Sequence, residues 1–133
     1  MTKTYKWGIL GPGKIAHRFA EALQNVPGAK TYAVASRDKN RALELAATYR
    51  IPVVHDNYES LIQDPEVDII YIATPHSFHH EQAIMCLNNK KAVLCEKPLS
   101  VDYKRALQIV EAARSNNTFL MEAMWTRFMP ATL

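Results

Sequence analysis

The sequence predicts a doubly wound α/β domain, a three-layer arrangement in which helices cover both faces of a parallel sheet. Two observations predict it. Short runs of β-forming residues alternate with segments of helical period along the chain, and one run, 69–72 (IIYI), is apolar at every position. A strand that is apolar on both sides needs cover on both faces of its sheet. Strand–helix–strand repeats give right-handed crossovers and therefore parallel strands.

The individual elements follow from the same patterns. The expected strands lie at 6–10, 31–35, 53–55, 68–73, 92–95 and 118–121. Between them, apolar residues recur at three- and four-residue steps, as in a helix with one buried face. These stripes lie within 15–23, 42–49, 80–87 and 106–113.

Composition indicates a globular protein without nucleic-acid or membrane partners. The chain has 133 residues, 48% of them hydrophobic and 22% charged, and its 16 basic residues are scattered among 13 acidic ones. No apolar stretch approaches the length of a membrane span. Cys86 and Cys95 form neither a disulfide framework nor a zinc site, and they fit a reducing cytoplasm.

The turn after the first expected strand, GPGKIA at 11–16, matches the G-x-G-x-x-A fingerprint of dinucleotide-binding sites. Gly11 permits a tight turn, and Gly13 lets a pyrophosphate approach the backbone. Lys14 and Ile15 begin the following helix, whose free N–H groups and partial positive charge favour phosphate. The alternative is a glycine turn that serves close packing alone.

The end of the second expected strand favours NADP over NAD. Ser36 and Arg37 stand where NAD-binding domains usually carry an acid that accepts from the ribose hydroxyl. Arg37 can bind a 2′-phosphate, and Ser36 can donate a hydrogen bond to it. Asp38 falls later, at a position that suits a helix N-cap. A solvated arginine is the competing interpretation, so NAD stays possible.

The fourth expected strand runs into TPHSFHH at 74–80, at the edge of the sheet where ligands bind. Thr74 and Pro75 turn the chain there. His76 at this rim either contacts the nicotinamide ribose or has a structural role, whereas packing is favoured for His80. A metal site of these histidines and His79 is disfavoured, because the spacing lacks an i, i+4 pair.

The fifth expected strand ends in Glu96, Lys97 and Pro98, on the same rim. A lysine there can orient a substrate hydroxyl or take part in its proton transfer. Pro98 restricts the backbone on either side and helps to fix where Lys97 points. The alternative is a surface ion pair in a loop.

Five segments together resemble the N-terminal domain of the glucose–fructose oxidoreductase, inositol dehydrogenase and rhizopine-catabolism (Gfo/Idh/MocA) family. They are GILGPGKIAHRFAEAL, VASRD, ATPHSFHHEQA, VLCEKPLS and FLMEAMWTRFMP. The resemblance covers essentially the whole chain and is strongest to the dimeric dihydrodiol dehydrogenase and xylose dehydrogenase branch, which uses NADP. It implies a Rossmann-type fold.

The resemblance also implies an activity, which is hydride transfer between nicotinamide and a carbinol carbon of a sugar, polyol or diol. Lys97 matches the catalytic or substrate-orienting lysine of the family, with Glu96 beside it. Trp125 and Arg127 match residues that line the cofactor and substrate cleft. The family histidine after the T-P pair is matched by His79, but His76 stands where many members have asparagine.

The same resemblance sets the expected domain boundaries. Residues 1–123 form the NAD(P)-binding domain, and 124–133 begin the connection to a second α+β domain that is absent from this chain. In the family that domain closes the substrate pocket and usually forms the oligomer, so the chain alone is expected to be inactive. The alternative is a stand-alone NAD(P)-binding or redox-sensing module without catalysis.

Overall fold

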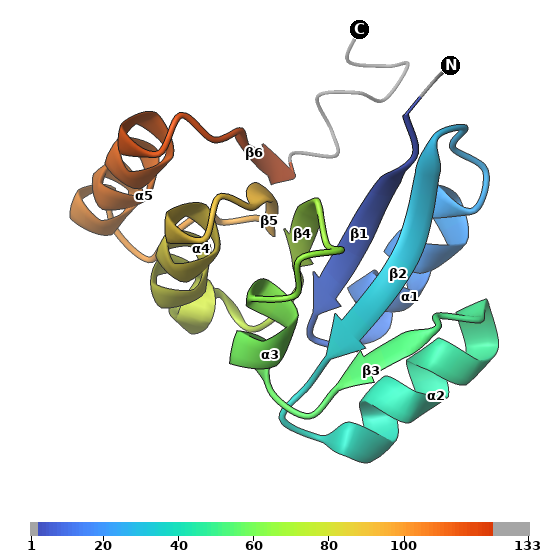
Figure 1. Cartoon of the computed structure of the whole chain (residues 1–133). Helices are drawn as coiled ribbons and strands as arrows, with labels where there is room; N and C mark the ends of the chain where they lie inside the picture. The colour runs from blue at the N-terminus through green and yellow to red at the C-terminus, as the bar shows by residue number, and fades with distance from the viewer. Residues whose placement is uncertain (1–2, 124–133) are drawn as a thin grey trace, which may run out of the picture.

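The computed structural model describes residues 3–123. They form one six-stranded sheet in which every pair of neighbouring strands is parallel, with helices on both faces (Figure 1). The strands are β1 (Tyr5–Leu10), β2 (Ala29–Ala35), β3 (Val53–His55), β4 (Ile69–Ile72), β5 (Ala92–Glu96) and β6 (Leu120–Ala123). The predicted doubly wound α/β fold is confirmed.

Five α-helices and one 3₁₀ turn connect the strands. They are α1 (Lys14–Leu23), α2 (Lys39–Tyr49), α3 (Tyr58–Ile62), the 3₁₀ turn η1 (His76–Phe78), α4 (His79–Asn88) and α5 (Tyr103–Ser115). The four longer α-helices contain the four predicted stripes. None of the helices within residues 3–123 combines the length and the apolar character needed to cross a bilayer.

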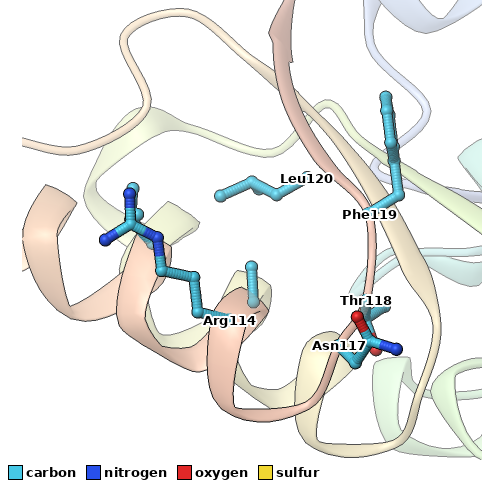
Figure 2. Close-up of a pocket in the computed structure, with 7 residues that line it drawn as sticks. Arg114, Asn117, Thr118, Phe119 and Leu120 are labelled. Carbon is cyan, nitrogen blue, oxygen red and sulfur yellow. The ribbon is translucent and has the colours of Figure 1, made fainter.

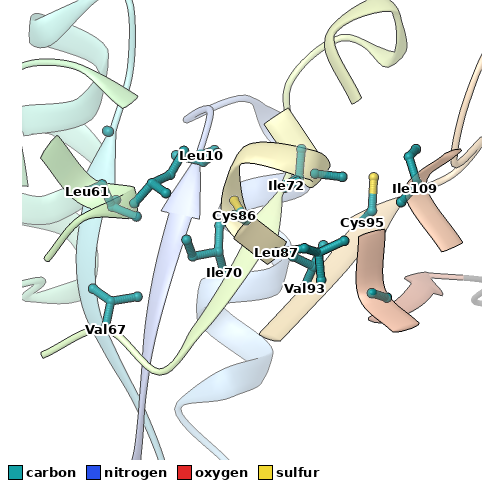
Figure 3. Close-up of a cluster of buried hydrophobic side chains, with 14 of the residues drawn as sticks. Leu10, Leu61, Val67, Ile70, Ile72, Cys86, Leu87, Val93, Cys95 and Ile109 are labelled. Atoms are coloured by element: carbon teal, nitrogen blue, oxygen red, sulfur yellow. The ribbon is translucent and has the colours of Figure 1, made fainter. Parts of the chain in front are cut away.

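Two apolar clusters hold the layers together, one on each face of the sheet. Because successive side chains of a strand point to opposite faces, Ile9 packs against α1 and α2, while its neighbour Leu10 packs against α3 and α4. Figure 3 shows the second of these clusters, where side chains of α3, α4 and α5 meet those of β1, β4 and β5. Full burial of one such Leu or Ile side chain contributes about 1.5–3 kcal/mol.

The strand order, β3-β2-β1-β4-β5-β6, reverses direction at β1. The chain runs outward from β1 through β2 to β3 and then crosses back to place β4 on the other side of β1. The loops after β1 and β4 therefore leave toward opposite faces and open a crevice at the carboxyl edge of the sheet. This crevice is where the predicted site residues converge.

Several predicted element ends were wrong. Strand β6 begins at Leu120, two residues later than expected, because the Thr118 N–H bonds to the Ala113 carbonyl and closes the end of α5. Strand β2 begins at Ala29, earlier than expected, since it pairs from Tyr5 onward with β1. The sequence patterns did not predict α3 and η1, which are too short to show a periodic stripe.

Candidate functional site

A hollow of about 480 Å³ opens at the crevice between the carboxyl ends of β1, β2 and β4. Each of the three strands ends in a loop that contributes part of its wall. Of the predicted site residues, the hollow brings together Gly11, Gly13, Lys14, Ile15, Ser36, Arg37, Thr74 and Pro75. They come from three segments that are distant in sequence, and the sheet topology makes these segments neighbours.

The two glycines of the first turn are constrained in different ways. Gly11 has φ +93°, and a Cβ there would lie 3.1 Å from the backbone carbon and oxygen of Ala73. Gly13 has φ −74°, and a Cβ there would meet nothing nearer than Arg41 Nη2 at 4.0 Å. The fold itself therefore requires glycine at position 11. At position 13 a side chain would only fill open space in the hollow.

The start of α1 faces this open space with its N–H groups unsatisfied by any side chain. Gly13 is the N-cap, it makes no side-chain capping hydrogen bond, and the first turn carries no acidic residue. The first N–H groups of a helix have no partner within the helix, and the helix dipole adds partial positive charge. An anionic group of a ligand, such as a pyrophosphate, fits this position.

Polar and basic residues form the wall at the end of β2. Ser36 is buried, and its Oγ accepts a hydrogen bond from Asp38 N at 3.0 Å. The Asp38 carboxylate accepts from the N–H groups of Asn40 and Arg41, at 3.1 and 3.4 Å, so it caps α2 as predicted. Both of these hydrogen bonds go to Oδ1.

Basic side chains surround the same wall. Arg37 is exposed, and its Cζ lies 5.7 Å from the centre of the Phe78 ring. Arg41, in the first turn of α2, also lines the hollow, as do Lys14 and Tyr58. The pattern of cations is that of a site for a multiply charged anion.

Arg41, Tyr58 and Phe78 were missed by the sequence analysis. For Arg41 a signal existed, because an N-cap at Asp38 places residue 41 in the first turn of the helix, facing the loop before it. Tyr58 and Phe78 belong to α3 and η1, which carried no periodic signal.

The histidines after β4 occupy three different environments. His76 is exposed on η1. His80 is partly exposed, with Nε2 2.6 Å from Gln108 Oε1 on α5, a contact between helices. His79 is the buried one, at 1% exposure. Within residues 3–123, no cluster of His, Cys, Asp or Glu is arranged to hold a metal ion.

Both ring nitrogens of His79 face carbonyl oxygens. Nε2 lies 2.9 Å from the Thr74 oxygen, and Nδ1 lies 2.8 Å from the Pro98 oxygen. Carbonyl oxygens only accept, so the ring must donate: a neutral imidazole donates to one of the two, and a protonated one to both. His79 thus lies beneath the rim and joins the loop after β4 to the loop after β5.

Glu96 and Lys97 lie beyond the hollow, at the end of β5. The Tyr71 hydroxyl, in β4, donates to the Glu96 carboxylate, and the Tyr71 ring stacks on Phe19 with centres 3.9 Å apart. Burial, helped by the hydrogen bond to Glu96, raises the pKa of Tyr71 above its usual value. Lys97 is exposed, and the Lys97–Pro98 peptide bond is cis. The predicted Trp125 and Arg127 lie outside the described residues.

A second hollow, of about 440 Å³, lies between α5 and β6 (Figure 2). It is lined by Arg114, Asn117, Thr118, Phe119 and Leu120, together with two further residues of α5. None of these side chains belongs to the predicted site. The candidate functional site is therefore the first hollow together with the adjacent end of β5.

Comparisons with known proteins point to one family. Residues 5–124 match the model of an oxidoreductase family with an NAD-binding Rossmann fold. A trans-1,2-dihydrobenzene-1,2-diol dehydrogenase from Danio rerio is 45% identical over 130 residues, which make up 96% of this chain and 39% of that protein.

Solved structures agree with this match. A 3-ketoreductase from Actinomadura kijaniata, in complex with TDP-benzene and NADP, matches with a TM-score of 0.92 at 30% identity, covering 97% of this chain and 41% of that one. A myo-inositol 2-dehydrogenase from Lactobacillus plantarum matches with a TM-score of 0.88 at 27% identity, covering 96% and 38%. The chain spans about two fifths of the length of these relatives.

Proposed function

Because the chain belongs to the oxidoreductase family with the NAD-binding Rossmann fold, the Gfo/Idh/MocA family, we propose that it binds NADP(H) as part of a dehydrogenase. The dehydrogenase would act on a CH–OH group of a sugar, polyol or diol substrate. The observation that carries the proposal is the open space over Gly13, in front of the uncapped start of α1. A ligand with a pyrophosphate and a further anionic group fits this arrangement.

The residues of the hollow divide into two groups under this proposal. The N–H groups at the start of α1, with Lys14, hold the pyrophosphate. Arg37 and Arg41 bind the 2′-phosphate, and the Ser36 hydroxyl donates to it. Asp38, the acidic residue in the lining, directs Oδ1 to the start of α2, and basic side chains lie around it. This combination favours NADP over NAD.

The reaction takes place at the adjacent end of β5. A bound nicotinamide supplies the hydride donor or acceptor. Lys97 orients the substrate hydroxyl and takes part in moving its proton, and Glu96, held by Tyr71, borders the nicotinamide side of the site. His76, Trp125 and Arg127 complete the proposed cleft.

Substrate and assembly are proposed from relatives of whose length the chain spans about two fifths. The relative from Danio rerio is named as a dehydrogenase of a trans-dihydrodiol, and this chemistry is carried over as a proposed substrate class. A sugar or polyol is equally compatible with the neighbouring ketoreductase and inositol dehydrogenase. Homo-oligomerisation through a second domain is likewise proposed, on the basis of the family resemblance.

Calorimetric titration of NADP and NAD into the wild type and the Arg37→Ala and Arg41→Ala variants tests the cofactor assignment. Loss of one charge-assisted contact should weaken NADP by about 1.5–3 kcal/mol, or roughly 10- to 150-fold in Kd. NAD affinity should change little. Arg18→Ala, an exposed arginine on α1, serves as the control. An equal loss for both cofactors would contradict the 2′-phosphate assignment.

A further inference from the structure

We propose that His79 and Glu122 are positioning residues that hold the Pro98–Leu99 peptide from opposite sides and thereby fix the backbone from which Lys97 extends. The geometry of this clamp is independent of any ligand. Its consequence for catalysis rests on the proposed function, in which Lys97 acts on the substrate hydroxyl.

The clamp consists of contacts to both polar groups of one peptide unit, its C=O and its N–H. His79 Nδ1 lies 2.8 Å from the Pro98 oxygen, and Leu99 N donates to Glu122 Oε2 at 2.6 Å. That oxygen and that N–H belong to the same planar unit, and in a trans peptide they point in opposite directions. With the ring proton of His79 on Nδ1, two hydrogen bonds from opposite sides fix the orientation of the plane, which one bond alone would leave free to rotate.

Both sides of the clamp are anchored in regular structure. His79 is in the first turn of α4 and is 1% exposed. Glu122 is in β6, where it pairs in register with Cys95 of β5. The Leu99 side chain adds a third anchor, since it packs against the buried cluster beneath α4 and α5. The clamp thus joins the carboxyl ends of β4, β5 and β6, which lie side by side in the sheet (Figure 1).

The Lys97 side chain has no polar partner of its own in the described part of the chain. Its side chain is exposed, and within residues 3–123 it makes no hydrogen bond or ion pair. The position from which the side chain extends is therefore set by the backbone alone. The Pro98 ring restricts one backbone dihedral, and the clamped peptide that follows restricts the next. Together they leave the chain after Lys97 little freedom.

The His79 ring also relates Lys97 to the hollow. Its Nε2 faces the oxygen of Thr74, and Thr74 lines the hollow. One buried ring therefore lies between the rim of the proposed cofactor site and the loop of the proposed catalytic lysine. Displacements of about 1 Å between reacting groups can lower a rate by about a hundredfold, so such a link bears directly on catalysis.

Nuclear magnetic resonance of the whole chain tests the clamp without any ligand. In the wild type, the Lys97 amide should have a rigid order parameter of about 0.85, and Glu122→Ala or His79→Phe should lower it toward 0.6 or less. Exchange of the Leu99 amide hydrogen should accelerate about tenfold or more in Glu122→Ala. Glu122→Gln should restore most of both signals, because its amide oxygen still accepts.

Matched controls separate a local clamp from a general structural role. Glu111→Gln changes an exposed carboxylate on α5, and His80→Gln changes the residue next to His79. Neither should alter the order parameter of the Lys97 amide. The amide of Val93, bonded within the sheet to the Phe119 oxygen, should keep its protection in every variant. A Lys97 amide that is flexible in the wild type, or that stays rigid in Glu122→Ala, would overturn the proposal. Uniform loss of protection including Val93 would also overturn it.

Kinetics of the whole enzyme test the catalytic consequence. Glu122→Ala should lower kcat about tenfold or more with the Kd of NADPH unchanged, and Glu122→Gln should recover most of the rate. A parallel loss of NADPH affinity would contradict the positioning role. If the wild type binds no NADPH, the proposed function is wrong, and the order parameters still decide whether the clamp exists.

Discussion

At the scale of single residues, the two glycines of the first turn differ in how much each contributes to stability. Gly11 has a positive φ that residues with a side chain rarely adopt. A Cβ at this position would lie 3.1 Å from backbone atoms of Ala73. Gly11→Ala should therefore lower the free energy of unfolding by about 1–3 kcal/mol. Gly13→Ala should lower it by less than about 1 kcal/mol, since only a weak N-cap preference is lost. Urea unfolding of both variants measures this; equal losses would contradict the difference.

The sequence could predict residues whose role is local. The fingerprint from Gly11 to Ile15 and the N-cap at Asp38 depend on neighbouring residues; the structure places the former around the hollow and confirms the latter at the start of α2. It could not predict which of two adjacent histidines is buried. His79 and His80 differ by one position on α4, and the choice depends on the Pro98 carbonyl, 19 residues from His79.

Both cysteines should be chemically inert in the folded protein. Burial, with the nearby carboxylates of Glu122 and Glu96, raises the pKa of Cys95 to about 12, and burial raises that of Cys86 as well. At pH 8 a pKa of about 12 leaves roughly one thiolate in 10⁴, and the thiolate is the reactive form. Iodoacetamide should label both thiols only after denaturation. Mass spectrometry detects the label, and rapid labelling of native Cys95 would contradict this account.

At the scale of elements, a set of polar contacts holds the segment between α3 and β4. His55 Nε2 lies 2.9 Å from Asp64 Oδ2, and Glu66 N donates to Asp64 Oδ1 at 2.9 Å. Lys91 Nζ donates to the carbonyl oxygens of Asp64 and Val67, at 2.6 and 2.7 Å. Burial pushes the pKa of Asp64 upward, but the hydrogen bonds from Glu66 N and His55 outweigh it and hold the pKa below 3.8.

The lowered pKa predicts a specific dependence of stability on pH. Because the folded pKa of Asp64 lies below the unfolded value near 3.8, its contribution is present above that pH and is lost as pH falls through the folded pKa. Asp64→Asn should remove this contribution, about 1–3 kcal/mol at neutral pH. Urea unfolding between pH 3 and 7 measures it, with Glu44→Gln, at an exposed carboxylate on α2, as the control. If the free energies of unfolding of the wild type and Asp64→Asn differ by the same amount at pH 3 and at pH 7, the prediction is contradicted.

The alternation of elements could be predicted from sequence, but their ends could not. All six strands were found because β-forming runs are a local signal. The start of β6 was misplaced because Thr118 and Phe119 favour strands locally, whereas the hydrogen bond from Thr118 N to Ala113 assigns that residue to the end of α5. Tertiary contacts decide such boundaries, and no periodic pattern records them.

At the scale of the whole molecule, one edge of the sheet carries both parts of the proposed site. The carboxyl ends of β1, β2 and β4 form the hollow, and the end of β5 carries Lys97. The sequence could predict this shared edge, since the strands of a parallel sheet all end on the same side. It could not predict the clamp, because Glu122 is 23 residues from Leu99 and was recognised only as part of a longer segment.

The central claim is that the hollow over Gly13 binds NADP(H). Calorimetric titration of NADPH into the wild type and Gly13→Val, with circular dichroism on the same samples, tests it most directly. The β-branched side chain would occupy the space left open above the start of α1. A single NADPH should bind to the wild type, and binding should be lost in Gly13→Val while the dichroism spectrum stays the same. No binding to the wild type, or undiminished binding to a folded Gly13→Val, would contradict the account.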